Sequence, residues 1–128
     1  MADKKVKVLV IDDEESLCFF VKANLELGGK YEVLIATNGM KGLWSAEKDK
    51  PDVILLDIMM SGMDGFEVLK RLKSGEKTSM IPVIMLTALQ DEGSKAKADD
   101  LQSDDYVVKP VAIGILKESI DAAVKGRK

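Results

Sequence analysis

The sequence predicts an α/β domain built on a doubly wound, five-stranded parallel sheet with five helices. Five short apolar runs alternate along the chain with five segments in which apolar residues recur at helical spacing. The connections between them are short, and right-handed crossovers then place helices on both faces of one sheet. For five strands, the order 2-1-3-4-5 is the leading candidate among the topologies that remain.

The five apolar runs are the expected strands. The third run is apolar without a break from Val53 to Leu56, as in a strand covered on both faces, and it ends at Asp57. Pro82 stands directly before the fourth run, where a strand tolerates proline. The expected strands are residues 6–11, 31–36, 53–57, 83–87 and 105–108.

Apolar spacing and chain breakers define the helices. Gly28-Gly29 ends the first helix, and Pro51 follows the second. In the last helix, Ile115 lies off the apolar stripe, and we expect it to be exposed. The candidates for inward faces are Leu17, Phe20, Val21 and Leu25; Leu43, Trp44 and Ala46; Phe66, Leu69 and Leu72; and Ile113, Leu116, Ile120, Ala123 and Val124.

The fourth helix, expected at residues 91–101, is weakly amphipathic. Its only apolar residues are Ala96, Ala98 and Leu101. A helix that buries so little apolar surface is held loosely. This segment is therefore a candidate for movement.

Composition limits the classes of function. The chain has 128 residues, 46% of them hydrophobic, which suits one domain over residues 1–128 with a substantial core. The net charge of -3 gives no broad basic surface, so we expect no direct binding to nucleic acid. The single cysteine, Cys18, cannot form an internal disulfide, and we expect it to be a small buried residue. No membrane span or signal peptide is evident, which predicts a cytoplasmic protein without membrane contact.

Polar residues stand at the carboxyl ends of four expected strands. Asp12 and Asp13 follow the first, Asp57 ends the third, Thr87 ends the fourth and Lys109 follows the fifth. Each has an ordinary explanation on its own, such as a helix cap, a strand residue or a solvated side chain. Because the carboxyl ends of parallel strands share one sheet edge, we expect these side chains to meet in one crevice.

Three carboxylates in one crevice require a positive partner. At about 4 Å, each pair repels by about 4 kcal/mol in an effective dielectric near 20. Mg²⁺ fits oxygen ligands of this kind, and Lys109 supplies a second positive charge. The cation, the lysine and the Thr87 hydroxyl together suit the oxygens of a phosphoryl group in transfer. The chain has no histidine, so any chemistry rests on carboxylates, hydroxyls and lysines. Asp57 is then the candidate nucleophile at this site, and an aspartyl phosphate is the expected product.

Four stretches, taken together, resemble a response-regulator receiver domain, which has a flavodoxin-like fold. They are VLVIDDE at residues 8–14, DVILLDIMM at 52–60 with GMDG at 62–65, PVIMLTA at 82–88 and DYVVKP at 105–110. The resemblance covers essentially the whole chain. It implies a phosphorylation-activated signalling protein of a two-component system, in which residues 1–128 form a single receiver domain.

The resemblance also implies roles for individual residues. Asp57 would accept a phosphoryl group from a histidine kinase or a histidine phosphotransfer protein. Asp12, Asp13, Asp57 and the carbonyl of Met59 would arrange Mg²⁺, and Thr87 and Lys109 would bind the phosphoryl group. We expect no turnover of a free substrate.

Further expectations from the resemblance concern the switch and the output. The Lys109-Pro110 bond would be cis, and Tyr106 would be an aromatic switch that moves with Thr87. Helix 91–101, Tyr106 and the last helix would form the face that meets a downstream protein target.

The chain departs from the family pattern at three places. Ser61 stands where proline is common, Val111 stands where an aromatic residue is common, and residues 101–104 replace the usual Gly-Ala approach to the fifth strand. These departures concern the output face rather than the phosphorylation chemistry.

Three other readings compete with a phosphorylated switch. A phosphorylation-independent adaptor with the same fold remains open. A phosphatase of the haloacid dehalogenase kind would need a second Asp where this chain has Met59. A flavin binder would need a phosphate loop after the first strand, where the acidic turn at residues 12–15 would repel phosphate.

Overall fold

The computed structural model describes residues 4–88 and 92–126 and shows the predicted parallel sheet, in the order β2-β1-β3-β4-β5. The strands coincide with the five apolar runs. They are β1 (Val6–Ile11), β2 (Tyr31–Ala36), β3 (Val53–Asp57), β4 (Val83–Thr87) and β5 (Asp105–Val108).

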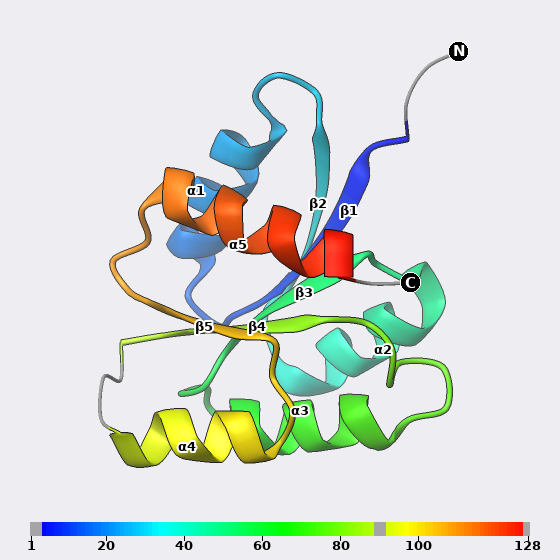
Figure 1. The fold of residues 1–128 in the computed structure, drawn as a ribbon, viewed down its shortest axis with the longest axis vertical. Coiled ribbons are helices and arrows are strands. Elements are labelled where there is room, and N and C mark those ends of the chain that lie inside the picture. The colour runs from blue at the N-terminus through cyan, green and yellow to red at the C-terminus, as the bar shows by residue number, and fades with distance from the viewer. Residues whose placement is uncertain (1–3, 89–91, 127–128) are drawn as a thin grey trace.

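The helices cover both faces of the sheet. Figure 1 shows α1 and α5 on one face and α2, α3 and α4 on the other. Their bounds are α1 (Glu15–Glu26), α2 (Gly39–Asp49), α3 (Gly65–Ser74), α4 (Glu92–Asp100) and α5 (Ile113–Gly126). No helix among the described residues combines the length and the apolarity needed to cross a membrane.

Alternate strand residues point into two separate cores. In β1, Leu9 and Ile11 belong to the core under α2 and α3, whereas Val8 and Val10 belong to the core under α1 and α5. All four side chains are fully buried. Both faces of the sheet are therefore apolar at its centre, which is why β3 and β4, whose residues are all buried, read as nearly unbroken apolar runs.

The inward face of α2 differs from the predicted one. Trp44 is 62% exposed, and the Lys48 ammonium lies 4.4 Å from the centre of its ring. The residues that face the sheet are small, because α2 lies so close to β1 that a Cβ added at Gly42 would come within 2.6 Å of the Ile11 side chain. The expectation that Trp44 faces inward is therefore wrong, whereas Ala46 is buried as predicted.

The inward face of α1 matches the prediction at Leu17, Val21 and Leu25 but not at Phe20. Cys18, Val21 and Leu25 are fully buried, whereas Phe20 is 46% exposed. The prediction placed Phe20 in the core because it is apolar and lies in phase with Leu17. The side of α1 that faces the sheet instead carries the small Cys18. Cys18 was expected to be buried, so that prediction is confirmed.

Two side chains of α1 bond the outer edge of β2 at Val33. The Val33 N–H donates to Glu26 Oε2 at 2.9 Å, and Lys22 Nζ donates to the Val33 carbonyl at 2.9 Å. Lys22 and Glu26 also form an ion pair one turn apart, at 2.9 Å. The backbone groups of Val33 that point away from β1 are thus bonded within the domain.

The weak helix and the exposed residue of the last helix are confirmed. In α4, Ala98 is buried, and the helix ends at Asp100, one residue before the predicted end. In α5, Leu116 and Ile120 are buried, and Ile115 is 60% exposed.

Candidate functional site

The acidic turn after β1 holds one buried and one exposed carboxylate. Asp12 is fully buried and Asp13 is exposed. The Glu14 N–H donates to Asp12 Oδ1 at 2.9 Å, and the Cys18 thiol donates to the Asp12 carbonyl at 3.3 Å. Burial first, and the charge of Asp12 second, raise the pKa of Cys18 to about 12, so this buried cysteine stays a protonated thiol near neutral pH.

Asp57 ends β3 and is 4% exposed. The loop after it is closed by Gly65, whose N–H donates to the Ile58 carbonyl at 2.7 Å. A Cβ at Gly65 would collide with the backbone of Asp57 and Ile58. Asp64 then caps α3 by accepting the Glu67 N–H at 3.0 Å. Close backbone contact therefore fixes Asp57 at the sheet edge.

Three carboxylates meet at this edge, as predicted. Asp12, Asp13 and Asp57 each offer one oxygen, and these oxygens lie within 4.8 Å of one another. Oxygen donors of this charge and spacing fit a hard divalent cation such as Mg²⁺. The chemistry of the donor set therefore fits the expected metal.

Lys109 lies against the same carboxylates. Its Nζ is 2.9 Å from Asp12 Oδ2, 3.5 Å from Asp57 Oδ1 and 3.6 Å from Glu14 Oε1. The shortest contact is thus with Asp12 rather than with Asp57. Sequence reasoning did not assign Glu14 to the site, although it directly follows the acidic pair.

The electrostatics of the site favour a further positive charge. Burial first, and repulsion by Asp12 second, raise the pKa of Asp57 from 3.8 to about 6, although Lys109 opposes the shift. Burial lowers the pKa of Lys109, but its contacts with Asp12, Asp57 and Glu14 outweigh burial and raise it. One lysine therefore compensates the carboxylates only in part.

Thr87 and Lys109 are positioned by adjacent strands. Thr87 is fully buried at the end of β4 and pairs with Val108 of β5. The Lys109 N–H donates to the Thr87 carbonyl at 2.7 Å, so the backbones of the two residues are joined directly. The Lys109-Pro110 bond is cis, which confirms that expectation. Tyr106 of β5 lies opposite Met85 of β4 and is half-buried against the core under α2 and α3.

The loop after β3 is tied to the acidic turn. The Ser61 N–H donates to Asp13 Oδ2 at 3.1 Å. A proline at this position would lack that donor, so the departure at Ser61 adds a contact that the sequence did not reveal. Met59, two residues earlier, is 65% exposed.

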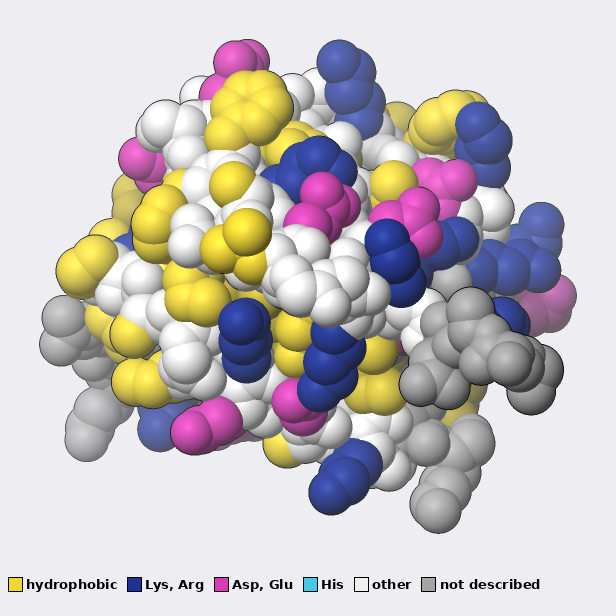
Figure 2. Space-filling view, turned by 90° about the horizontal axis from the view of Figure 1, so that it is seen from above, with side chains coloured by type: hydrophobic (Ala, Val, Ile, Leu, Met, Phe, Trp, Pro, Cys, Tyr) yellow, Lys and Arg dark blue, Asp and Glu magenta, His cyan; other side chains and the backbone are white. Residues whose placement is uncertain are grey.

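A shallow apolar hollow of about 460 Å³ adjoins the site. Leu17, Phe20, Pro110 and Val111 line it together with Lys109 and two further residues. Figure 2 shows hydrophobic side chains gathered on the left half of the view, over α1, the β5–α5 connection and the start of α5. Charged side chains dominate the right half.

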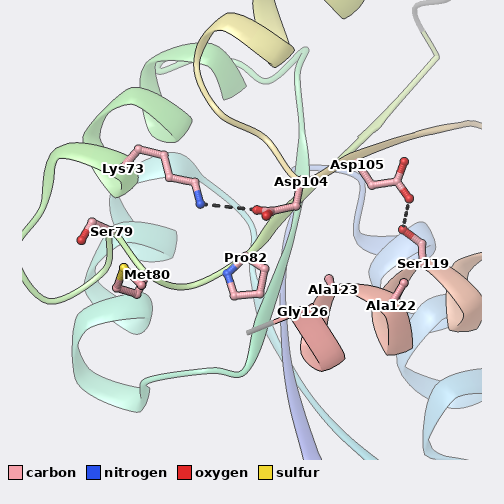
Figure 3. Close-up of a pocket in the computed structure, with 10 residues that line it drawn as sticks. All are labelled: Lys73, Ser79, Met80, Pro82, Asp104, Asp105, Ser119, Ala122, Ala123 and Gly126. Atoms are coloured by element: carbon pink, nitrogen blue, oxygen red, sulfur yellow. Dashed lines mark hydrogen bonds and ion pairs between the residues drawn. The ribbon is translucent and has the colours of Figure 1, made fainter. Parts of the chain in front are cut away.

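A second hollow, of about 520 Å³, lies away from the site, at the amino ends of β4 and β5 (Figure 3). Its polar groups contact one another. Lys73 Nζ lies 3.4 Å from Asp104 Oδ2, and the Ser119 hydroxyl donates to Asp105. None of the predicted site residues lines this hollow.

Sequence and structure comparisons with known proteins agree on one family. The profile of the response regulator receiver domain matches residues 8–121. Protein PilH of Pseudomonas aeruginosa is 37% identical over 120 residues, which cover 94% of this chain and 98% of that protein. The chemotaxis protein CheY4 of Vibrio cholerae has a structure that superposes with a TM-score of 0.88 at 30% identity, covering 94% of this chain and 99% of that one.

Other relatives are much longer than this chain. The alkaline phosphatase synthesis transcriptional regulatory protein PhoP of Bacillus subtilis is 44% identical over 104 residues. The match covers 81% of this chain but 42% of that protein. The chain thus spans half or less of the length of several curated relatives.

Proposed function

Since the chain belongs to the response regulator receiver domain family, we propose that residues 1–128 form one receiver domain that switches when Asp57 is phosphorylated. The observation that carries this proposal is the convergence of three carboxylates and Lys109 at one sheet edge. The phosphoryl donor is a histidine kinase or a histidine phosphotransfer protein.

In the proposed reaction, an oxygen of the Asp57 carboxylate attacks the phosphorus of a phosphohistidine. The new O–P bond forms as the N–P bond to the donor histidine breaks, and the histidine retains the electron pair. Asp12, Asp13, Asp57 and the Met59 carbonyl would hold Mg²⁺, which supplies positive charge to the carboxylates and to the phosphoryl oxygens. Because one product is the modified protein itself, the domain acts as a signalling module rather than as a turnover enzyme.

Lys109 and Thr87 would bind the arriving phosphoryl group. Lys109 Nζ already lies within 3.5 Å of Asp57 Oδ1, so a small movement of its flexible side chain brings it to a phosphoryl oxygen. The Thr87 hydroxyl can donate to the same group. The half-buried Tyr106, two strand positions before Val108, would then reorganise together with α4 and α5, and this face would meet a downstream protein target.

Mass spectrometry after treatment with acetyl phosphate and Mg²⁺ tests the proposal. We expect a labile adduct of one phosphoryl group in the parent and none in Asp57→Ala. Asp49→Ala serves as the control, because Asp49 lies at the end of α2 and outside the predicted site. An adduct that persists in Asp57→Ala would place the acceptor elsewhere, and an unmodified parent would favour the adaptor.

The phosphoryl group on Asp57 is expected to be long-lived. Met59 and Leu89 lie two residues beyond Asp57 and Thr87, and neither side chain can orient an attacking water; Leu89 lies outside the described residues. In the double variant Met59→Asn with Leu89→Glu, we expect the phosphoryl group on Asp57 to be hydrolysed roughly tenfold faster. One added hydrogen bond to the attacking water would lower the barrier by about 1.4 kcal/mol. Decay of the adduct in Mg²⁺ measures this rate, and equal decay in variant and parent would contradict the expectation.

A further inference from the structure

The carboxyl end of α4 forms a Schellman motif with an unusual residue. The Gln102 N–H donates to the Asp99 carbonyl at 2.9 Å, and the Ser103 N–H donates to the Ala98 carbonyl at 3.0 Å. In this motif the residue that follows the C-cap is left-handed and is usually glycine. Here it is Gln102, with φ of 70°, so the helix end requires a conformation that its side chain disfavours.

The next residue adds a second unfavourable feature. The Ser103 Oγ is buried and has no hydrogen-bond partner among residues 4–88 and 92–126. A buried hydroxyl without a partner is destabilising relative to one that faces water. Two neighbouring residues therefore both oppose the observed end of α4.

The chain on the β5 side of this joint is firmly held. The Asp104 N–H donates to the Val83 carbonyl at 2.7 Å, and Asp104 Oδ2 accepts the Val83 N–H at 2.7 Å. Lys73 adds an ion pair to the same carboxylate, as Figure 3 shows. The start of β5 is thus fixed to β4 and to α3.

The chain on the α4 side is weakly held. Ala98 is buried, but most of the helix is exposed, and α4 lies at the margin of the domain in Figure 1. Lys97 Nζ lies 4.6 Å from the centre of the Phe66 ring, which adds an exposed cation–π contact with α3. The joint therefore connects a fixed strand to a helix with little to hold it.

We propose that Gln102 and Ser103 form a strained hinge that makes the last turn of α4 the first part of the output face to unwind when Asp57 is phosphorylated. This inference rests on the proposed function. Unwinding the last turn lets Gln102 leave the left-handed region and brings the Ser103 hydroxyl to water. Both unfavourable features are thereby relieved, so the hinge lowers the free energy needed to release α4.

Amide hydrogen exchange over residues 92–103 tests the hinge, in the parent and in Gln102→Gly with Ser103→Ala. Without any ligand, we expect the double variant to exchange at least fivefold more slowly in the last turn of α4, because both changes stabilise the folded helix end. With beryllofluoride and Mg²⁺ as the phosphoryl mimic, we expect faster exchange there in the parent and a smaller increase in the variant.

Lys50→Gly provides the matched control. Lys50 is also a left-handed residue after a helix, with φ of 49°, but it follows α2, which is anchored close to the sheet. We expect this variant to leave the exchange of α4 and its response to beryllofluoride unchanged.

The outcomes separate the hinge from the function. Unaltered exchange of α4 in the double variant, or the same change in Lys50→Gly, would overturn the hinge. An equal response of parent and variant to beryllofluoride, with Asp57 labelled by acetyl phosphate in both, would also overturn it and leave the switch intact. Failure to label Asp57 in the parent would instead contradict the proposed function, while the ligand-free comparison still decides whether the joint is strained.

Discussion

Asp57→Asn is expected to raise the free energy of unfolding at pH 7 by about 3 kcal/mol when divalent cations are absent, since the pKa of Asp57 lies about two units above its ordinary value and each unit is about 1.36 kcal/mol. The cause is the buried position of Asp57 next to Asp12. Asparagine keeps nearly the same shape without the charge.

The effect has a defined dependence on pH. The pKa of Asp57 is raised from 3.8 to about 6, so between these values the folded state binds more protons than the unfolded state. The parent therefore loses stability as pH rises from about 4 through 6. The difference between Asp57→Asn and the parent should be small at pH 4 and should reach its full size near pH 7.

Urea unfolding in EDTA at pH 4 and pH 7 measures this difference. Addition of Mg²⁺ should then stabilise the parent more than Asp57→Asn, because the cation binds a site that the variant has lost in part. Equal stabilities of the two proteins at pH 7 in EDTA would show that Lys109 fully compensates the buried carboxylates.

Gly65→Ala is expected to lower the free energy of unfolding by about 3 kcal/mol and to abolish labelling of Asp57. The added Cβ would collide with the backbone of Asp57 and Ile58, and neither can move as a flexible side chain does. Relief of the collision must displace the end of β3 or the start of α3. Either movement shifts Asp57 from its place beside Lys109.

Gly114→Ala is the matched control for this prediction. Gly114 lies in α5, and a Cβ there meets nothing within 4 Å. We expect it to stabilise the domain by about 0.5 to 1 kcal/mol, through helix propensity alone. Similar behaviour of the two alanine variants in urea unfolding and acetyl phosphate labelling would contradict the prediction. It would show that the backbone of Asp57 and Ile58 can accommodate a Cβ at position 65.

The sheet and the place of the site were predictable because they depend on local sequence. Each strand is an unbroken or nearly unbroken apolar run, and parallel strands bring their carboxyl ends to one edge. The residues after those runs, among them Asp12, Asp57 and Lys109, therefore met as expected.

Features that depend on distances between elements were not predictable. The exposure of Trp44 follows from the close approach of α2 to Ile11, which apolar spacing does not encode. The left-handed conformation of Gln102 follows from the way α4 must turn into β5. Residues 101–104 differ from the usual Gly-Ala approach to the fifth strand, and this difference is visible in the sequence. Only the hydrogen bonds at the end of α4 show that it places Gln102 in the left-handed conformation.

The bonded edge of β2 has a consequence for association between copies. An exposed edge strand offers its backbone to a strand of another molecule, and such pairing leads to aggregation. At Val33 both backbone groups already have partners in Glu26 and Lys22. Intermolecular sheet growth past Val33 would require both of these side chains to be displaced, so α1 protects this point of the edge against strand addition.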